Sequence, residues 1–193
     1  MPYRYAEFHA GEYYHIYHRG QDRKKIFFAS ENYLHFLRLL KKYRDAFEMN
    51  LIAYCLMPNH FHLLVQPKIS DNLSRFVGRL EQSYAQAINK RYHRRGSLFH
   101  NERFRHAHVY SDRYQLICCR YIHHNPKKDG LVANLRDWPF SNYLEFVGAR
   151  EGELWMPAFR ERFFKTAKEY EDFVAGYGTE EDRDLEKYLF GSK

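Results

Sequence analysis

The stretch LIAYCLMPNHFHLLV, residues 51–65, decides the fold. Two apolar runs, residues 51–57 and 61–65, stand on either side of a short Pro-Asn-His connection. Short apolar runs that a tight turn separates are typical of an antiparallel hairpin. We therefore expect two paired strands here, and the flanking segments indicate the kind of sheet that contains them.

The segments around the hairpin predict a sheet with helices. An aromatic segment at residues 12–18 predicts a strand, and apolar residues at helical spacing predict one helix capped by Ser30 and another capped by Asn72. Residues 104–109 predict a fourth strand, followed by a third helix that Pro126 stops. The order β-α-β-β-α-β-α is that of an α+β, ferredoxin-like fold: a split βαβ antiparallel sheet with helices on one face, plus an extra C-terminal helix.

Charge divides the 193-residue chain into two predicted parts. Residues 1–149 carry 23 Lys and Arg against 13 Asp and Glu, net +10, whereas residues 150–193 carry 8 against 11, net −3. We expect a basic domain followed by an acidic, helical extension. The extension is expected to dock on the basic part and modulate access to it, or to stabilise it through Trp155, Phe163 and Phe164.

Composition excludes several classes of protein. No run approaches the roughly 18 apolar residues of a membrane span, and charges stand near the start where a secretory signal is apolar. Three cysteines without a CxxC pair favour a reducing cytoplasm over a disulfide framework. The basic charge, with 17 Tyr and 16 Phe, fits a nucleic-acid-binding protein, and equally a basic enzyme with a tyrosine-rich core.

A pair of histidines lies within the predicted hairpin. Residues i and i+2 of a strand point to the same face, so His60 and His62 project together while Phe61 points to the other side. Two convergent imidazoles are the beginning of a metal site. The same spacing also arises by chance on a solvated strand face.

A second polar pair lies on the third predicted helix. Tyr121 and Asn125 are four residues apart and so share a helix face. Because Pro126 is expected to end the helix, we expect Asn125 to be accessible. Each residue also has an ordinary structural interpretation, Tyr121 as a core aromatic and Asn125 as a residue of a helix end.

Three separated motifs occur together in one order. They are residues 54–65 (YCLMPNHFHLLV), residues 96–104 with GSLF and RF, and residues 121–132 with YIHHNP and GLV. In this combination the chain resembles the IS200-like Y1 transposases, most of all their single-copy relatives, the REP-associated tyrosine transposases. The resemblance covers roughly residues 10–148, and it implies that residues 1–149 form the catalytic domain.

The resemblance implies a function for each motif. In that family a His-hydrophobic-His strand binds a divalent metal, Mg²⁺ or Mn²⁺, and one helix-borne tyrosine attacks a DNA phosphate. By this likeness His60 and His62 are metal ligands, Tyr121 is the catalytic nucleophile, and Asn125 completes the metal coordination. The softness of two imidazoles alone suits Zn²⁺ or another transition metal. The family's first-strand motif, Tyr-His-x-x-Asn-Arg-Gly, is present with His18 in place of Asn.

The implied chemistry agrees with these residue types. A tyrosine phenol has a pKa of about 10 in water and needs a nearby positive charge or base to act at neutral pH. A metal beside it polarises a phosphate oxygen and takes up charge in the transition state. The product is a 5′-phosphotyrosine with a free 3′-OH, and attack by another 3′-OH rejoins the strands.

A basic stretch between the site motifs is the predicted DNA-binding surface. Residues 90–108 carry a net charge of +5, with three aromatic residues between the cations. Guanidinium groups bind phosphates and aromatic rings stack on unpaired bases, although a solvated basic loop has the same composition. The predicted DNA contacts are Arg19 of the first-strand motif and Lys90, Arg91, Arg94, Arg95, Arg103 and Arg105.

The sequence therefore predicts a metal-dependent single-strand DNA endonuclease and strand transferase that acts beside DNA hairpins. The alternative is a hairpin-binding or single-strand-binding protein that has the same fold and does not cleave. A histidine-triad nucleotide hydrolase is disfavoured because position 64 is Leu, where a further alternating His would be needed. We expect a cytoplasmic, nucleoid-associated bacterial protein that acts as a monomer or a homodimer, without contact to a membrane.

Overall fold

The computed structural model describes residues 7–190. The strands are β1 (Tyr14–Arg19), β2 (Met49–Met57), β3 (His60–Pro67) and β4 (Arg105–His108). The longer helices are α1 (Ser30–Ala46), α2 (Asn72–Arg91) and α3 (Asp112–Lys128), and shorter ones follow: α4 (Tyr143–Phe146), α5 (Pro157–Phe163), α6 (Ala167–Ala175) and α7 (Glu180–Phe190). Two 3₁₀ turns, η1 (Gln21–Arg23) and η2 (Leu135–Asp137), complete the set.

The four strands form one sheet in the order β2-β3-β1-β4. All neighbouring strands run antiparallel, and the β2–β3 hairpin closes with Met57 opposite His60. This strand order, with α1 and α2 as the crossovers, is that of the ferredoxin-like split βαβ unit. The predicted fold class is confirmed.

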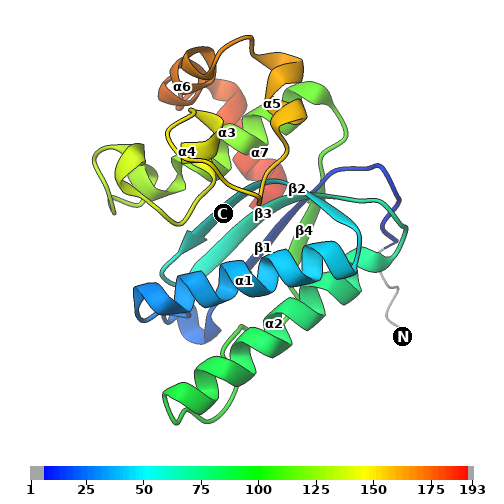
Figure 1. Cartoon of the computed structure of the whole chain (residues 1–193), viewed down its shortest axis with the longest axis vertical. Coiled ribbons are helices and arrows are strands. Elements are labelled where there is room, and N and C mark those ends of the chain that lie inside the picture. The colour runs from blue at the N-terminus through cyan, green and yellow to red at the C-terminus, as the bar shows by residue number, and fades with distance from the viewer. Residues whose placement is uncertain (1–6, 191–193) are drawn as a thin grey trace.

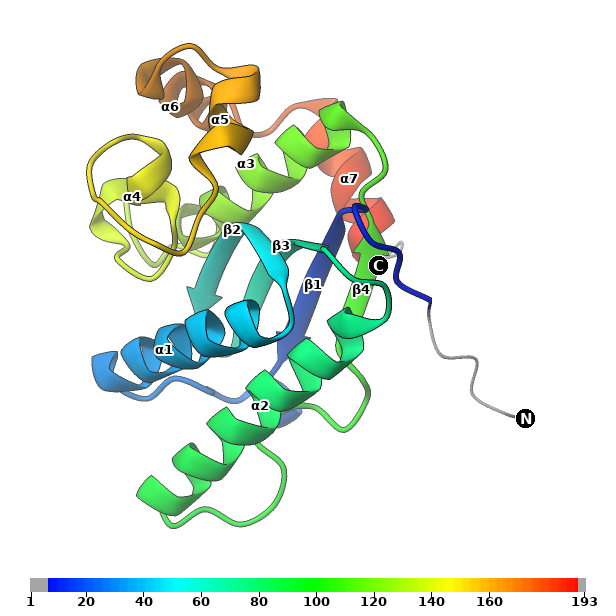
Figure 2. The same ribbon diagram turned by 45° about the vertical axis from the view of Figure 1, so that its right-hand side comes forward.

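The helices lie in two layers, one on each side of the sheet (Figures 1 and 2). Helices α1 and α2 cover one face, where alternate residues of β3, Phe61 and Leu63, enter a core with Phe36 and Phe76. The other face packs against α3 and the C-terminal helices, and Leu64 belongs to that second core. The side-chain alternation of β3 thus assigns its histidines to the α3 face.

The structure corrects three predicted helix ends. Ser30 and Asn72 are first helical residues, preceded by Ala29 and Asp71 at the N-cap positions. Near α1 the backbone N–H groups of two residues before the helix are satisfied instead by the Asn32 side chain. Pro126 lies inside α3, which continues to its end two residues later, since a proline in the last turn removes only one helical hydrogen bond.

Two further findings concern the whole described chain. Between residues 7 and 190 no helix is both long and apolar enough to cross a membrane. The three cysteines are free thiols and all are buried.

Candidate active site

The alternation of β3 brings His60 and His62 together on the face that α3 covers. Their ring centroids lie 4.9 Å apart. His62 is directly opposite Tyr17 of β1 in the strand register, and the Tyr17 ring lies 5.0 Å from the His62 ring and 5.4 Å from the His60 ring. The two histidines therefore converge as the HxH spacing predicts.

Each histidine has one ring nitrogen in a hydrogen bond. His60 Nδ1 lies 2.7 Å from Asn59 Oδ1, and His62 Nδ1 lies 3.0 Å from Nε2 of His15. Burial lowers the pKa of His60 to about 4 and holds that of His62 well below its usual range. Both rings are therefore neutral at pH 7, and a neutral imidazole has the lone pair that a metal needs.

The second nitrogen of His62, Nε2, is buried and has no hydrogen-bond partner. A buried polar atom without a partner is unfavourable unless something else binds it. Residues 7–190 contain no cluster of three or more His, Cys, Asp and Glu side chains suited to a metal. Two imidazoles alone do not complete the coordination of a metal, and an amide oxygen is one type of ligand that can add to them.

Tyr121 of α3 lies against His62 and His15. Its ring centroid is 5.4 Å from that of His62, with the rings nearly perpendicular, and 6.2 Å from that of His15. Burial raises the pKa of Tyr121 above its usual range, and the negative charge of Glu186 raises it further. The phenol is thus protonated in the arrangement that the structure shows.

Asn125 lies one turn of α3 after Tyr121. Its Nδ2 donates a hydrogen bond of 2.7 Å to the Tyr121 carbonyl oxygen, which leaves Oδ1 outside that bond. Hydrogen bonding from Asn125 acts to lower the pKa of the Tyr121 phenol. The side chain is only 3% exposed, so the expectation that Asn125 is accessible is wrong: α3 runs past it, and the C-terminal segments pack on this helix.

A comparison with known protein families shows to which family the chain belongs. The family model for IS200-like transposases matches residues 9–125, a span that includes His60, His62, Tyr121 and Asn125. The chain belongs to this family. It is 26% identical over 140 residues to a Haemophilus influenzae protein assigned to the REP-associated tyrosine transposases, a match that covers 67% of this chain and 78% of the relative.

A solved structure shares the fold of this IS200-like transposase. It is a REP-associated tyrosine transposase bound to a REP hairpin, with a TM-score of 0.64 and 18% sequence identity. The match covers 81% of this chain and 94% of that chain. The resemblance inferred from the sequence motifs is thereby confirmed.

The last turn of α7 covers the candidate site. The Phe190 ring centroid lies 5.7 Å from that of Tyr121, 6.1 Å from that of His62 and 5.4 Å from that of Tyr17. Sequence reasoning did not identify Phe190, because nothing in residues 150–193 indicates which side chain reaches the site. It also overlooked Tyr17 and His15, although their alternation on the first strand follows the same rule as the histidine pair.

Ion pairs attach α7 to the helix that carries Tyr121. Arg120 and Asp182 form a buried pair with an N–O distance of 2.8 Å, and Lys128 lies 2.5 Å from Glu186. The acidic extension therefore docks on the basic body, as the charge division predicts. It also completes the second core, to which α5 and α6 contribute Phe159, Tyr170 and Val174.

The predicted DNA contacts fall into two groups. Arg19 and Arg105 belong to β1 and β4, and Arg105 is paired with Tyr17, so its side chain lies on the face of the histidines. Its guanidinium also donates to the Phe190 carbonyl oxygen at 3.4 Å. The other five predicted DNA contacts belong to the end of α2 or to the segment between α2 and β4: Lys90, Arg91, Arg94, Arg95 and Arg103.

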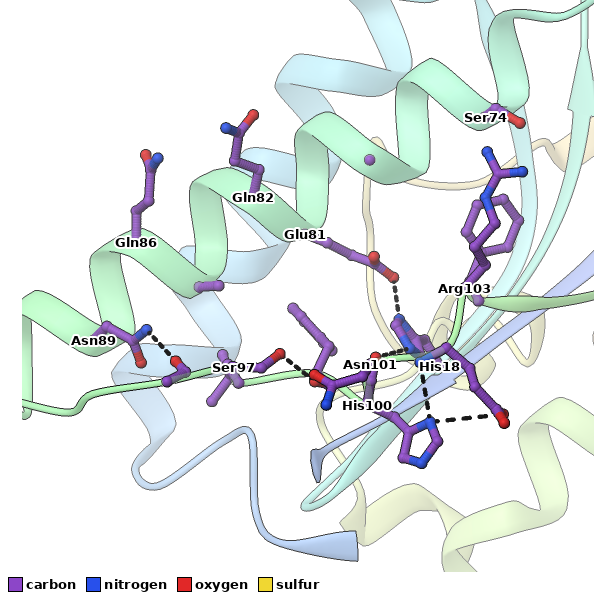
Figure 3. Close-up of a pocket in the computed structure, with 17 residues that line it drawn as sticks. His18, Ser74, Glu81, Gln82, Gln86, Asn89, Ser97, His100, Asn101 and Arg103 are labelled. Atoms are coloured by element: carbon purple, nitrogen blue, oxygen red, sulfur yellow. Dashed lines mark hydrogen bonds and ion pairs between the residues drawn. The ribbon is translucent and has the colours of Figure 1, made fainter. Parts of the chain in front are cut away.

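A groove of about 530 Å³ lies between α2 and residues 96–104 (Figure 3). His18 is at this groove, on the opposite face of the sheet from Tyr121, with Nδ1 2.7 Å from Glu81 Oε1 and Nε2 3.2 Å from the His100 carbonyl oxygen. Both ring nitrogens are thus engaged inside the protein. The residue that replaces the family's Asn links α2 to the segment before β4.

Proposed function

We propose that this protein is a metal-dependent enzyme that cuts and rejoins single-stranded DNA beside hairpins, with Tyr121 as its nucleophile. One observation carries the proposal: Tyr121 packs on His62, whose buried Nε2 has no partner, next to His60 on the same face. A phenol beside a neutral imidazole that can bind a metal is an arrangement that supports phosphoryl transfer. Family membership supports the same reaction class.

The reaction exchanges one phosphoester bond for another. The Tyr121 phenol gives up its proton as its oxygen forms a bond to the phosphorus. The bond from phosphorus to the 3′ oxygen breaks, and that oxygen takes up a proton to become a 3′-OH. The DNA 5′ end stays on the enzyme as a phosphotyrosine, and attack by a 3′-OH restores a phosphodiester. No external energy source is needed, because one ester replaces another.

Residues of this chain would activate both the scissile phosphate and the Tyr121 phenol. His60, His62 and Asn125 would hold a divalent metal, which supplies positive charge at the scissile phosphate when bound. The Lys128 ammonium lies 5.1 Å from the Tyr121 ring centroid, and a positive charge at this range favours the phenolate. With α7 docked, the Glu186 carboxylate pairs with Lys128 and opposes this effect.

We propose Mg²⁺ or Mn²⁺ as the metal. The family resemblance implies these ions, and the amide oxygen of Asn125 with phosphate oxygens suits them. The two imidazoles also suit Zn²⁺. Cleavage measured separately with the three ions at equal concentration decides between these assignments.

The proposed substrate is single-stranded DNA with a hairpin. The solved relative is bound to a REP hairpin, which supports a hairpin partner for this chain. A scissile phosphate must reach Tyr121 between α3 and the sheet, and a continuous duplex is too bulky for that approach. Arg19 and Arg105 lie on the histidine face of the sheet and would contact the strand at the site, and the cations around the end of α2 would hold the adjoining duplex.

All four proposed site residues come from one chain, so a monomer can carry the reaction. The substrate also implies a location at the bacterial nucleoid, in the cytoplasm.

A second candidate function is hairpin binding without cleavage. The observation that favours it is the cover over Tyr121: Phe190 packs on the phenol ring, and burial keeps the phenol protonated. A protein fixed in this arrangement would bind DNA through its basic residues and leave the strand intact.

A cleavage assay separates the two functions. Full-length protein is incubated with an oligonucleotide that carries a hairpin and its single-stranded flanks, with Mg²⁺, Mn²⁺ or EDTA. We expect cleavage with a divalent ion, none with EDTA, and none for His62→Ala with either ion. DNA binding without any cleavage under all of these conditions would contradict the enzymatic proposal and favour the second candidate.

A further inference from the structure

His15 has no part in the reaction as described above, yet its side chain is buried against a proposed metal ligand. In the β1–β3 register His15 is opposite Leu64, so it lies diagonally across from His62 on the same face. The planes of the two imidazoles are nearly parallel, with an interplanar angle of 20° and ring centroids 5.2 Å apart. His15 is only 1% exposed, so its ring nitrogen meets His62 rather than solvent.

The hydrogen bond between the two rings determines where His62 carries its proton. His15 Nε2 and His62 Nδ1 are 3.0 Å apart, and such a bond needs one donor and one acceptor. If His15 donated, a neutral His62 would carry its proton at Nε2, where no acceptor meets it. If His62 donates from Nδ1, its Nε2 is left with a lone pair, as a metal ligand requires.

His60 shows the same arrangement. Its Nδ1 is 2.7 Å from Asn59 Oδ1, and the Asn59 amide is oriented by its Nδ2, which donates to the Arg23 carbonyl oxygen. The Asn59 oxygen can only accept, so His60 is protonated at Nδ1. Both histidines of the HxH pair thus have an acceptor at Nδ1, and Nε2 is the nitrogen that remains for a metal.

We infer that His15 is a positioning residue. Its Nε2 accepts a hydrogen bond from the Nδ1–H group of His62, which leaves the Nε2 lone pair of His62 for the divalent metal. The inference rests on the proposed function, since it assigns a residue that supports the proposed ligand set. Metal-bound histidines depend on such acceptors to fix the tautomer and the ring orientation, and removing one lowers metal affinity about 10- to 100-fold. His15 itself is not assigned as a ligand, because its Nε2 is used in this bond.

The first test measures Mn²⁺ binding to the full-length protein by calorimetry in the absence of DNA. His15→Leu removes the acceptor and is expected to weaken Mn²⁺ binding about 10- to 100-fold. His15→Gln keeps an amide oxygen that can accept from His62 Nδ1, and we expect it to stay within about threefold of the unmodified protein. The matched control is Leu64→Val, which disturbs the buried cross-strand partner of His15 but not its bond to His62.

The outcomes separate this inference from the proposed function. Loss of Mn²⁺ affinity in His15→Leu, with recovery in His15→Gln and no loss in Leu64→Val, supports the role of His15. Equal affinity of His15→Leu and the unmodified protein overturns it, and so does an equal loss in Leu64→Val, which indicates general disturbance of the core. An unmodified protein that binds no Mn²⁺, Mg²⁺ or Zn²⁺ refutes the metal site itself and the proposed function with it.

A second measurement tests the tautomer without any metal. Long-range proton–nitrogen NMR correlations distinguish a protonated from an unprotonated imidazole nitrogen in the metal-free protein. We expect the His62 ring to be protonated at Nδ1 and unprotonated at Nε2, and to lose this preference in His15→Leu. A His62 ring protonated at Nε2 in the unmodified protein would overturn the inference, whatever the metal affinity.

Discussion

The ring of Phe190 packs on the ring of Tyr121, with centroids 5.7 Å apart and an interplanar angle of 51°. Phe190 ends α7, and Tyr121 lies in the middle of α3, so the contact joins the acidic extension to the proposed nucleophile. Tyr121 is only 5% exposed in this arrangement. We propose that the extension controls access to the candidate site, in addition to completing the second core.

Replacing Phe190 is expected to increase cleavage. Phe190→Ala removes the ring that covers Tyr121 while Leu185 and Leu189 keep α7 in the core. We expect several-fold faster cleavage of the hairpin substrate in a single-turnover assay, and tighter DNA binding. Lys187→Ala, on the same helix with an exposed side chain, is the control and should match the unmodified protein. An unchanged rate for Phe190→Ala would show that this ring does not limit access.

Deleting the whole segment 157–193 is a less selective experiment. The deletion removes Phe159, Tyr170 and Val174 from the second core, and burial of each such side chain is worth about 1.5–3 kcal/mol. We expect loss of solubility, not a clean gain of activity. A soluble, folded truncation, as judged by a cooperative thermal transition, would show that the extension is dispensable for the core.

The buried histidines predict a loss of stability in acid. Burial lowers the pKa of His15 to about 3 and those of His60 and His123 to about 4, whereas unfolded histidines titrate near 6.5. As the pH falls below 6.5, the unfolded chain gains protons that the folded chain does not take up. The free energy of unfolding therefore falls, by about 2 kcal/mol per buried histidine between pH 7 and pH 5.

Denaturant unfolding at several pH values checks this prediction. Between pH 7 and pH 5 the free energy of unfolding of His15→Leu should fall by about 2 kcal/mol less than that of the unmodified protein, because one buried histidine is missing. A free energy of unfolding that stays constant between pH 7 and pH 5 would contradict the burial of these rings.

Metal binding is expected to stabilise the folded chain. A ligand that binds only the folded state adds about 2.7 kcal/mol when its concentration is 100 times its dissociation constant. Mn²⁺ should therefore raise the melting temperature of the unmodified protein, and EDTA should reverse the rise. His62→Ala should show no rise, whereas His93→Ala, which replaces a histidine in the turn after α2, should behave like the unmodified protein. A rise of equal size in His62→Ala would place the metal elsewhere.

The division of the basic residues predicts two kinds of DNA-binding defect. Arg105→Ala acts at the site face and should weaken binding of the single strand, whereas Arg95→Ala should weaken binding of the hairpin stem. Each variant should reduce the slope of log affinity against log salt by roughly 0.7 to 0.9 for every phosphate that it no longer neutralises. Affinities for hairpin, linear single-strand and duplex DNA are compared at one salt concentration. Equal or better binding and cleavage of the duplex would contradict the proposed substrate.

The local sequence pattern was sufficient to predict the sheet and to predict that the two histidines share one of its faces. In the hairpin, period-two alternation and a tight turn act over a few residues, so His60 and His62 could be assigned to one side of β3. Helix caps were less predictable. Ser30 and Asn72 have the right chemistry for capping, but each is the first helical residue and not the N-cap. Before α1, the Asn32 side chain accepts the backbone hydrogen bonds instead.

The packing of α7 over the site could not be predicted in the same way. Its contacts join α7 to β1, β3 and α3 across more than 60 residues of chain, and no periodic pattern specifies a pairing at that separation. Charge indicated only that the extension would dock. The place of Phe190 against Tyr121 follows from how α7 packs, which only the three-dimensional structure shows.

Attack of Tyr121 on DNA is tested most directly by mapping a covalent adduct. Full-length Phe190→Ala protein is incubated with a hairpin oligonucleotide and Mn²⁺ or Mg²⁺, digested with a protease and a nuclease, and analysed by mass spectrometry. Tyr121→Phe in the same background is the negative control, and Tyr143→Phe, which removes a hydroxyl from another buried tyrosine, is the matched control. We predict a nucleotide attached to Tyr121, absent in Tyr121→Phe and present in Tyr143→Phe; an adduct on another residue, or cleavage that persists in Tyr121→Phe, would contradict the role of Tyr121.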